Sequence, residues 1–180
     1  MDVTFDRDAI IAALTELADE LARSGTQIQI RVVGGAAISV GFDRETTTTD
    51  VYAMYGANPD VEKAARTIAY RNGWPENWLN DNVKQFASHF DTADDWINLD
   101  VRDGVAIRVA GARLLLAMKL LAARGRRDSQ DIDRLLDACA IKDADGALAV
   151  FDRYYPEEEL SERALRQLNE RFGGSKPAES

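Results

Sequence analysis

A Gly-Gly pair between two strand patterns is the feature that most limits how this chain can fold. Ile28, Ile30 and Val32 alternate with polar neighbours, which is the period of a strand with one buried face. That strand runs directly into Gly34 and Gly35, and small residues then predict a short helix. The run TTTTDVYAMY that follows is rich in β-branched and aromatic residues, so it predicts a second strand that pairs with the first.

Helical patterns precede and follow this segment. The spacing of apolar residues predicts a helix over 6–23 and another over 59–72, whose first turn is rich in acids. A Trp-rich loop then enters a short helix, and strands over 96–101 and 105–109 flank a tight hairpin turn. The remaining predicted helices cover 112–124, 129–141, 144–155 and 157–172.

These elements predict an α+β fold, in which a small mixed sheet is flanked by helices and followed by a C-terminal helical region. With 180 residues, the chain suits one compact domain or a small sheet domain with a helical extension. We expect residues 1–110 to form the sheet core and residues 111–172 to form a helical part of the same unit. Residues 173–180 have almost nothing to bury, so we expect a flexible tail there.

Composition excludes several classes of protein. No apolar run approaches the roughly 20 residues that a membrane span needs, and the N-terminus carries acids where a signal peptide carries lysines. The single Cys139 cannot form an intrachain disulfide and suits a reducing cytosol. We therefore expect a soluble, cytoplasmic protein with no membrane partner. Because the net charge is -9, contact with nucleic acid would need a local basic patch, such as Arg124, Arg126 and Arg127.

Two aspartates and the glycine pair carry the chemistry that the sequence suggests. Asp50 and Tyr52 lie two apart in the second strand, so their side chains share a face, and Asp100 lies inside a later strand. Carboxylates that converge from adjacent strands can hold two divalent cations, which in turn bind a nucleoside triphosphate. A turn at Gly34 and Gly35 lets backbone amides approach phosphate oxygens. This order suggests metal-assisted phosphoryl transfer.

A resemblance to a known family lies in the segment VVGGAAISVGFDRETTTTDVYAMYG. It resembles the motif of the DNA polymerase β-type nucleotidyltransferase superfamily, in particular the small bacterial branch of the AbiEii-type toxins of toxin-antitoxin and abortive-infection systems. Further on, WLNDNVKQF and KLLAARGRRDSQDIDRLL resemble two other segments of that branch. The matching positions are Gly34, Gly35, Arg44, Thr49, Asp50, Ala53, Lys119, Arg124, Asp128 and Asp131.

The resemblance implies the nucleotidyltransferase fold and an enzyme that uses Mg²⁺ or Mn²⁺. Such an enzyme transfers a nucleotide from a nucleoside triphosphate to an RNA such as the tRNA acceptor end, and it has a cognate antitoxin protein as partner. The resemblance further implies that Asp50 and Asp100 are catalytic metal ligands and that Lys119 holds the triphosphate. Asp128 and Asp131 would position that lysine, or the base and sugar.

The remaining implied contacts are with nucleotide and RNA. Gly34, Gly35, Arg44 and Thr49 would join Lys119, Asp128 and Asp131 in binding the nucleotide. The arginines of the basic patch would meet RNA phosphates, or they are solvated charges at a helix end.

Several of these residues also have simpler explanations. Lys119 stands among Leu and Met in the middle of a helix, which is costly unless an anion meets the ammonium group, but it could instead extend to water. Asp100 could be an ordinary residue of a polar face, and Asp95 competes with it for the ligand role. Asp128 and Asp131 could cap the next helix, where aspartate is favoured.

Tyr52 stands at the catalytic position where the family motif has its second aspartate. A neutral phenol with a pKa near 10 is a poor ligand for Mg²⁺, and its ring takes up space where metal and triphosphate would sit. We expect metal affinity and turnover to be severely reduced. Either the chain is a catalytically silent relative that binds a nucleotide or a partner, or Tyr52 replaces an aspartate of an active parent. A small hydroxylated acceptor is the alternative to RNA, since the acidic surface suits a cationic substrate.

Overall fold

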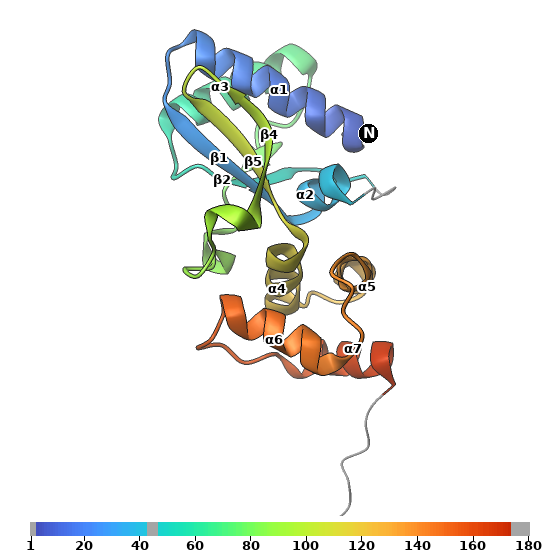
Figure 1. Ribbon diagram of the computed structural model, residues 1–180. Coiled ribbons are helices and arrows are strands. Elements are labelled where there is room, and N and C mark those ends of the chain that lie inside the picture. The colour runs from blue at the N-terminus through green and yellow to red at the C-terminus, as the bar shows by residue number, and fades with distance from the viewer. Residues whose placement is uncertain (1–2, 43–46, 174–180) are drawn as a thin grey trace, which may run out of the picture. The chain divides into compact units, whose positions relative to one another are not determined.

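The computed structural model describes residues 3–42 and 47–173, together with all their side chains except those of Arg126 and Arg127. Arg44, the side chains of those two arginines and the expected tail after Gly173 therefore lie outside the described residues. Within the described part, the chain forms a mixed five-stranded sheet and seven α-helices (Figure 1). The predicted α+β class is confirmed.

The chain divides into two compact units. Met1–Ala87 and Thr92–Gly111 form one, which we call the sheet unit. Ser88–Asp91 and Ala112–Ser180 form the other, which we call the helical unit. Each is described in turn.

The strands of the sheet unit lie in the order β3-β2-β1-β5-β4. β1 pairs antiparallel with β2, as predicted, and parallel with β5, while β4 and β5 form the predicted antiparallel hairpin. β3 pairs parallel with β2. The bounds of the strands are β1 Ile28–Val33, β2 Val51–Met54, β3 Leu79–Asn80, β4 Trp96–Arg102 and β5 Val105–Ala110.

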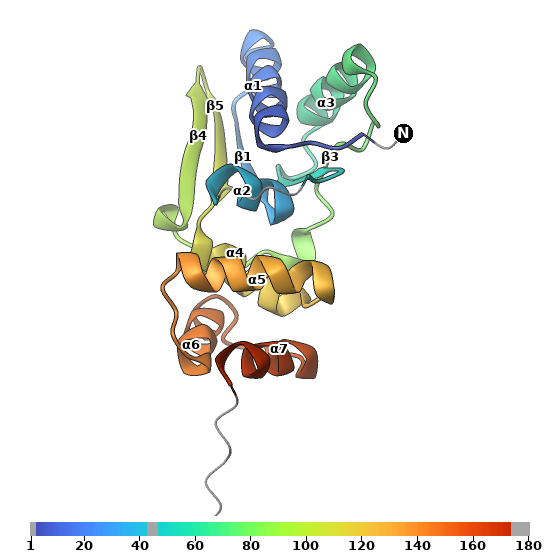
Figure 2. The same cartoon turned by 90° about the vertical axis from the view of Figure 1, so that its right-hand side faces the viewer.

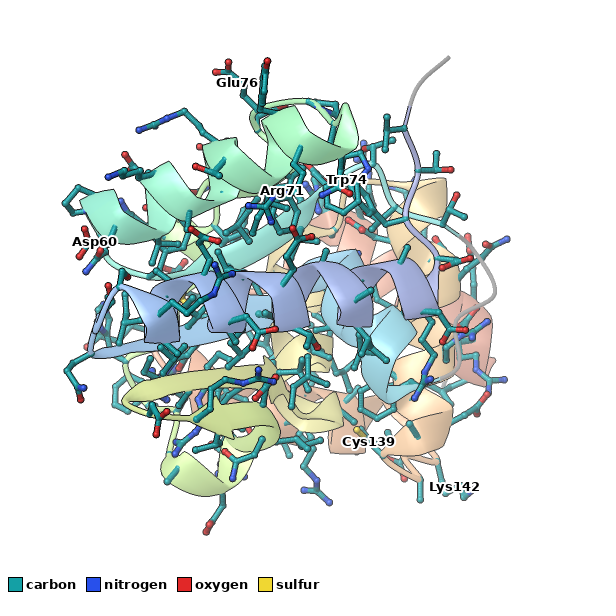
Figure 3. All side chains as sticks on the ribbon, turned by 90° about the horizontal axis from the view of Figure 1, so that it is seen from above. Asp60, Arg71, Trp74, Glu76, Cys139 and Lys142 are labelled. Carbon is teal, nitrogen blue, oxygen red and sulfur yellow. The ribbon has the colours of Figure 1, made fainter. Side chains whose placement is uncertain are left out.

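Helices α1 (Arg7–Arg23) and α3 (Pro59–Asn72) cover one face of this sheet (Figures 1 and 3). α1 begins where the Asp6 carboxylate accepts a hydrogen bond from the backbone N–H of Ala9, which satisfies one of the free donors of the first turn. α3 ends at Gly73, whose φ of 67° is the left-handed conformation that glycine adopts most easily. The remaining helical segments of this unit are α2 Gly34–Gly41, η1 Lys84–Phe86 and η2 Ala93–Asp95.

The face of the sheet beneath α1 is apolar. Val32 pairs with Ala53 of β2 and with Val109 of β5, and all three side chains are buried. Two residues further from the Gly34 turn, Ile30 pairs with Ile107, and both are fully buried. These rows form the core against which the helices pack, because removing apolar surface from water is the main favourable term in folding.

The opposite face is polar, since side chains alternate along a strand. The same register places Arg31 beside Met54 and Arg108, and Val33 beside Tyr52. Gln29, Arg31, Tyr52, Met54 and Arg108 define what we call the polar face.

The helical unit holds four helices among its described residues (Figure 2). α4 packs against both α5 and α6, and α6 packs against α7. Its core includes the fully buried side chains of Leu116, Leu120, Ile132, Leu135 and Leu136. The bounds are α4 Ala112–Ala122, α5 Arg126–Ala138, α6 Ala144–Tyr154 and α7 Glu162–Phe172.

Several elements differ from the sequence predictions, among them α5, which begins and ends three residues earlier than the predicted 129–141. The second strand is shorter than the run from Thr46 suggested, because Thr48 forms an isolated bridge with Phe5 instead. β3 was not predicted, since a two-residue strand leaves no periodic pattern. The last helix begins later than expected, because the Ser161 hydroxyl caps it by accepting from the N–H of Ala164.

None of the helices within residues 3–42 and 47–173 combines the length and the apolar character that crossing a membrane requires.

Gly34 offers a test of the turn between β1 and α2. Its φ of 68° is strained for any residue with a Cβ, so Gly34→Ala should lower the free energy of unfolding by about 1–2 kcal/mol. Gly41→Ala is the matched control, because a Cβ there meets nothing within 4 Å and no positive φ is required. Urea unfolding of both variants measures the difference, and equal effects would contradict the assigned turn.

Candidate functional site

The Tyr52 ring lies against the glycine turn. β1 and β2 are paired with Val33 opposite Tyr52, so the turn that follows Val33 lies beside the start of β2. A Cβ built on Gly34 would come within 3.4 Å of Tyr52 Cδ2. The Tyr52 ring therefore fills the space next to the turn.

Asp50 directly precedes β2 and lines an open cavity of about 540 Å³. Asn80 of β3 donates a long hydrogen bond of 3.5 Å from Nδ2 to Asp50 Oδ2. Trp74, labelled in Figure 3, lines the same cavity and packs edge-on against Phe5, with ring centroids 5.0 Å apart. Thr49, a predicted nucleotide-binding residue, also lines this cavity. Two of the predicted site residues are therefore together.

Asp100 lies elsewhere in the sheet unit. It pairs with Ile107 of the apolar face, and its carboxylate accepts a 2.9 Å hydrogen bond from Arg102 Nε. Arg102 also forms an ion pair with Asp19 of α1, so this cluster is on the side of the sheet that α1 covers. The hydrogen bond that Arg102 donates to Asp100 raises the pKa of the Arg102 guanidinium.

The expectation that Asp100 joins Asp50 therefore has to be corrected. β4 is three strands away from β2, which at about 4.8 Å per strand is roughly 14 Å across the sheet. Asp100 also lies on the face that α1 covers. The physical reason is a bulge between Asn98 and Asp100, because an extra residue in one strand reverses the alternation of side chains after it. Without that bulge, Asp100 would share the polar face with Asn98.

Asp95, the alternative ligand, is engaged in a local structure. Its carboxylate accepts hydrogen bonds from the backbone N–H of Thr92 at 2.8 Å and from the Thr92 hydroxyl at 3.1 Å. Thr92 and Asp95 form a capping box around η2. Asp95 therefore stabilises the start of η2.

The structure does not bring together the three carboxylate positions that the sequence suggested for a pair of divalent cations. One of these positions is Tyr52, and Asp100 lies beside Arg102 on the face that α1 covers. Asp50, directly before β2, is the remaining predicted metal ligand.

Lys119 is buried in the helical unit and is held by two carboxylates. Its Nζ lies 2.7 Å from Asp128 Oδ1 and 2.8 Å from Asp131 Oδ2. Lys119 is 6% exposed, and both aspartates are buried as well. The ammonium group thus does meet anions, which come from this chain, and it does not extend to water. We call these three residues the buried charge cluster.

Asp128 links this cluster to the loop between α4 and α5. Its second oxygen accepts a 2.7 Å hydrogen bond from the backbone N–H of Arg124. Burial by itself would raise the pKa of the Asp128 carboxyl, but the hydrogen bond and charge of Lys119, with the N–H of Arg124, hold that pKa below its ordinary value. Asp128 therefore holds both Lys119 and the loop that leads into α5.

The basic patch is described only in part. The Arg124 side chain is 58% exposed, and its Nε lies 3.4 Å from Asp128 Oδ2, so part of its charge is neutralised. The other two arginines of the patch are those whose side chains lie outside the described residues.

Sequence reasoning missed the pairing of Arg31 with Arg108 on the polar face. The sequence did contain one signal for the orientation of these arginines, since each alternates with buried β-branched residues in its own strand. That pattern predicts the face of each side chain, but it does not show that the two strands are neighbours.

Comparisons of this chain with protein-family models, curated proteins and solved structures found no match.

Removing the cation tests the buried charge cluster. Lys119→Met removes the ammonium group that lies between two buried carboxylates, so the free energy of unfolding should fall by about 3–5 kcal/mol. Lys142→Met, an identical change at an exposed position of the same unit, should have little effect. Urea unfolding followed by circular dichroism compares the two. Similar losses in both variants would mean that the cluster contributes no specific stability.

The depressed pKa of Asp128 predicts how stability depends on pH. A carboxyl whose folded pKa lies below its unfolded value stabilises the fold above that unfolded value, and this contribution is lost as the pH falls toward the folded pKa. The ordinary value is 3.8. The difference in unfolding free energy between the natural chain and Asp128→Asn should therefore be full at pH 5 and shrink toward pH 3. A difference that stays constant over this range would contradict the assignment.

Proposed function

We propose that this chain is a nucleotidyltransferase-fold protein of the bacterial AbiEii-type toxin kind, in which transfer is impaired by Tyr52. Its ancestral reaction is the transfer of a nucleotide from a nucleoside triphosphate to an RNA such as the tRNA acceptor end. The observation that carries the proposal is the position of the Tyr52 ring next to the Gly34 turn, where the motif calls for an acid.

The arrangement of β1, α2 and β2 supports the proposed fold. A strand runs into a left-handed glycine, the next residues open a helix, and the following strand returns antiparallel with Asp50 at its start. Backbone N–H groups at the beginning of a helix are free to bind phosphate oxygens. Gly34 and Gly35 are therefore assigned to the triphosphate, and Asp50 is assigned to its counterion.

A catalytically silent binding protein is the second candidate. Two observations favour it because they argue against catalysis. One is the phenol at position 52, and the other is the placement of Asp100 beneath α1. Titration with a nonhydrolysable triphosphate separates a former enzyme, which binds it in a Mg²⁺-dependent manner, from a scaffold that binds none.

Restoring the acid is the decisive experiment. Tyr52→Asp should remove the ring from the glycine turn and supply a second carboxylate two residues from Asp50. Transfer of labelled nucleotide to total RNA should rise by roughly a hundred-fold or more, since stabilising the charge that develops in phosphoryl transfer is worth several kcal/mol. The assay uses each nucleoside triphosphate with Mg²⁺ or Mn²⁺, and a panel of small hydroxylated molecules as alternative acceptors.

Two controls separate the acid from the mere loss of the ring. Tyr52→Phe keeps the ring and should stay inactive, whereas adding Asp50→Asn to Tyr52→Asp should abolish the restored transfer. If a folded Tyr52→Asp variant transfers nucleotide to no acceptor, the proposed descent from an enzyme is wrong. The catalytically silent binding protein is then the remaining candidate.

A further inference from the structure

An open cavity of about 460 Å³ lies within the helical unit, lined by residues of α4, of α6 and of the segment that joins α5 to α6. Ligand pockets in proteins typically measure roughly 300 to 1,000 Å³, so the cavity can hold a small molecule. None of the described residues assigned above to nucleotide transfer lines it. A ligand of this cavity is therefore a matter separate from the proposed function.

Part of the lining is apolar. Ile141 lies in the segment before α6, and Val150 and Tyr154 lie one turn apart on α6. Val150 and Tyr154 are buried by their neighbours, whereas Ile141 is partly exposed. Arg153 also lines the cavity, and its guanidinium carbon lies 4.9 Å from the centroid of the Tyr154 ring, which engages its charge. An apolar group of a ligand would leave water when it covers this lining, which favours binding.

Two further cations line the same cavity, Arg113 of α4 and Lys142 before α6. Both are exposed, and neither forms an ion pair or a side-chain hydrogen bond with any residue that the structure describes. Asp143 is the one acid of the described lining, and it caps α6 by accepting a 2.7 Å hydrogen bond from the N–H of Gly146. Positive charge thus exceeds negative charge here, although the whole chain has a net charge of -9.

Both cations lie at the beginning of a helix. Arg113 is the second residue of α4, whose first turn holds no acid, and Lys142 comes two residues before α6 begins. The N-terminus of a helix carries partial positive charge, so a cation is disfavoured there and an anion is favoured. An anion in the cavity would be attracted both by the two side chains and by the helix ends that carry them.

The charge of Arg113 acts on the interior of the cavity. Burial raises the pKa of the Cys139 thiol, and the positive charge of Arg113 works in the opposite direction. Cys139 lines the cavity together with Lys142, and both are labelled in Figure 3. A negative group beside the thiol would therefore lie within range of the same charge.

We infer that this cavity binds a small organic acid, with its carboxylate beside Arg113 and Lys142 and its apolar part against the apolar lining. Arginine offers a planar pair of N–H donors that matches the two oxygens of a carboxylate. Asp143 already offsets one of the two positive charges, so a ligand with a single negative charge restores the balance. A phosphate monoester, with about -1.5 to -2 at neutral pH, exceeds it.

The thiol gives a direct measure of occupancy. Cys139 is the only cysteine of the chain and lines the cavity, so its rate of alkylation by iodoacetamide reports on this cavity alone. The probes are hydrocinnamate, which joins a carboxylate to an apolar ring, its neutral amide, and inorganic phosphate. Hydrocinnamate should slow the alkylation of the natural chain to a saturating limit. The amide and phosphate should bind roughly ten-fold more weakly or less, because each lacks one of the two matching groups.

Variants separate the contribution of charge from that of space. Arg113→Gln should weaken the binding of hydrocinnamate roughly ten-fold or more, because hydrogen bonds between charged groups are the stronger kind. Arg166→Gln, the same change at an exposed position of α7, is the matched control and should bind normally. Ala149→Phe introduces a ring into the cavity from an exposed position of α6 and should abolish binding without altering any charge. Calorimetric titration supplies these affinities, since the loss of Arg113 also changes the thiol.

Equal binding of hydrocinnamate by Arg113→Gln and the natural chain, or an equal loss in Arg166→Gln, overturns the inference. So does an alkylation rate that hydrocinnamate leaves unchanged up to its solubility limit. If the amide or inorganic phosphate binds as tightly as hydrocinnamate, the site does not select an organic acid and the inference is again wrong. Binding that depends on Arg113 supports it whatever the outcome for Tyr52→Asp, because the two experiments concern different units.

Discussion

The pairing of β1 on both of its edges is the constraint on which the sheet unit depends. Because β2 runs antiparallel on one side and β5 parallel on the other, one register decides which residues reach the core and which reach the polar face. Val32 is buried beside two other apolar residues, and its neighbour Arg31 must then point the other way. The same register sets Tyr52 against the glycine turn and Arg31 beside Arg108.

Charge is handled differently in the two units. In the helical unit, one buried ammonium group lies between two buried carboxylates. On the polar face, the Gln29 oxygen accepts from both Arg31 and Arg108. Removing a charge from water is costly unless hydrogen bonds and opposite charges compensate it, so each of these groups is held by its neighbours.

Much of the fold could be predicted because it depends on local periodicity. The helix over 59–72 was predicted with its observed ends, since Asn58, Pro59 and Gly73 are capping and terminating residues whose effect is local. The hairpin between β4 and β5 likewise follows from the turn residues between two β-rich runs. The Asp100 placement could not be predicted, because a bulge leaves no signature in the pattern of residue types and reverses every side chain after it.

By itself, the sequence determined the order of the elements, the glycine turn, the phenol at position 52 and the need of Lys119 for an anion. Each of these follows from a residue and its immediate neighbours along the chain. Only the tertiary structure decided which anions meet Lys119, that Asp100 serves Arg102 and α1, and that two arginines from strands far apart in sequence become neighbours. Those outcomes depend on strand order and register, which are set when the whole sheet buries its apolar face.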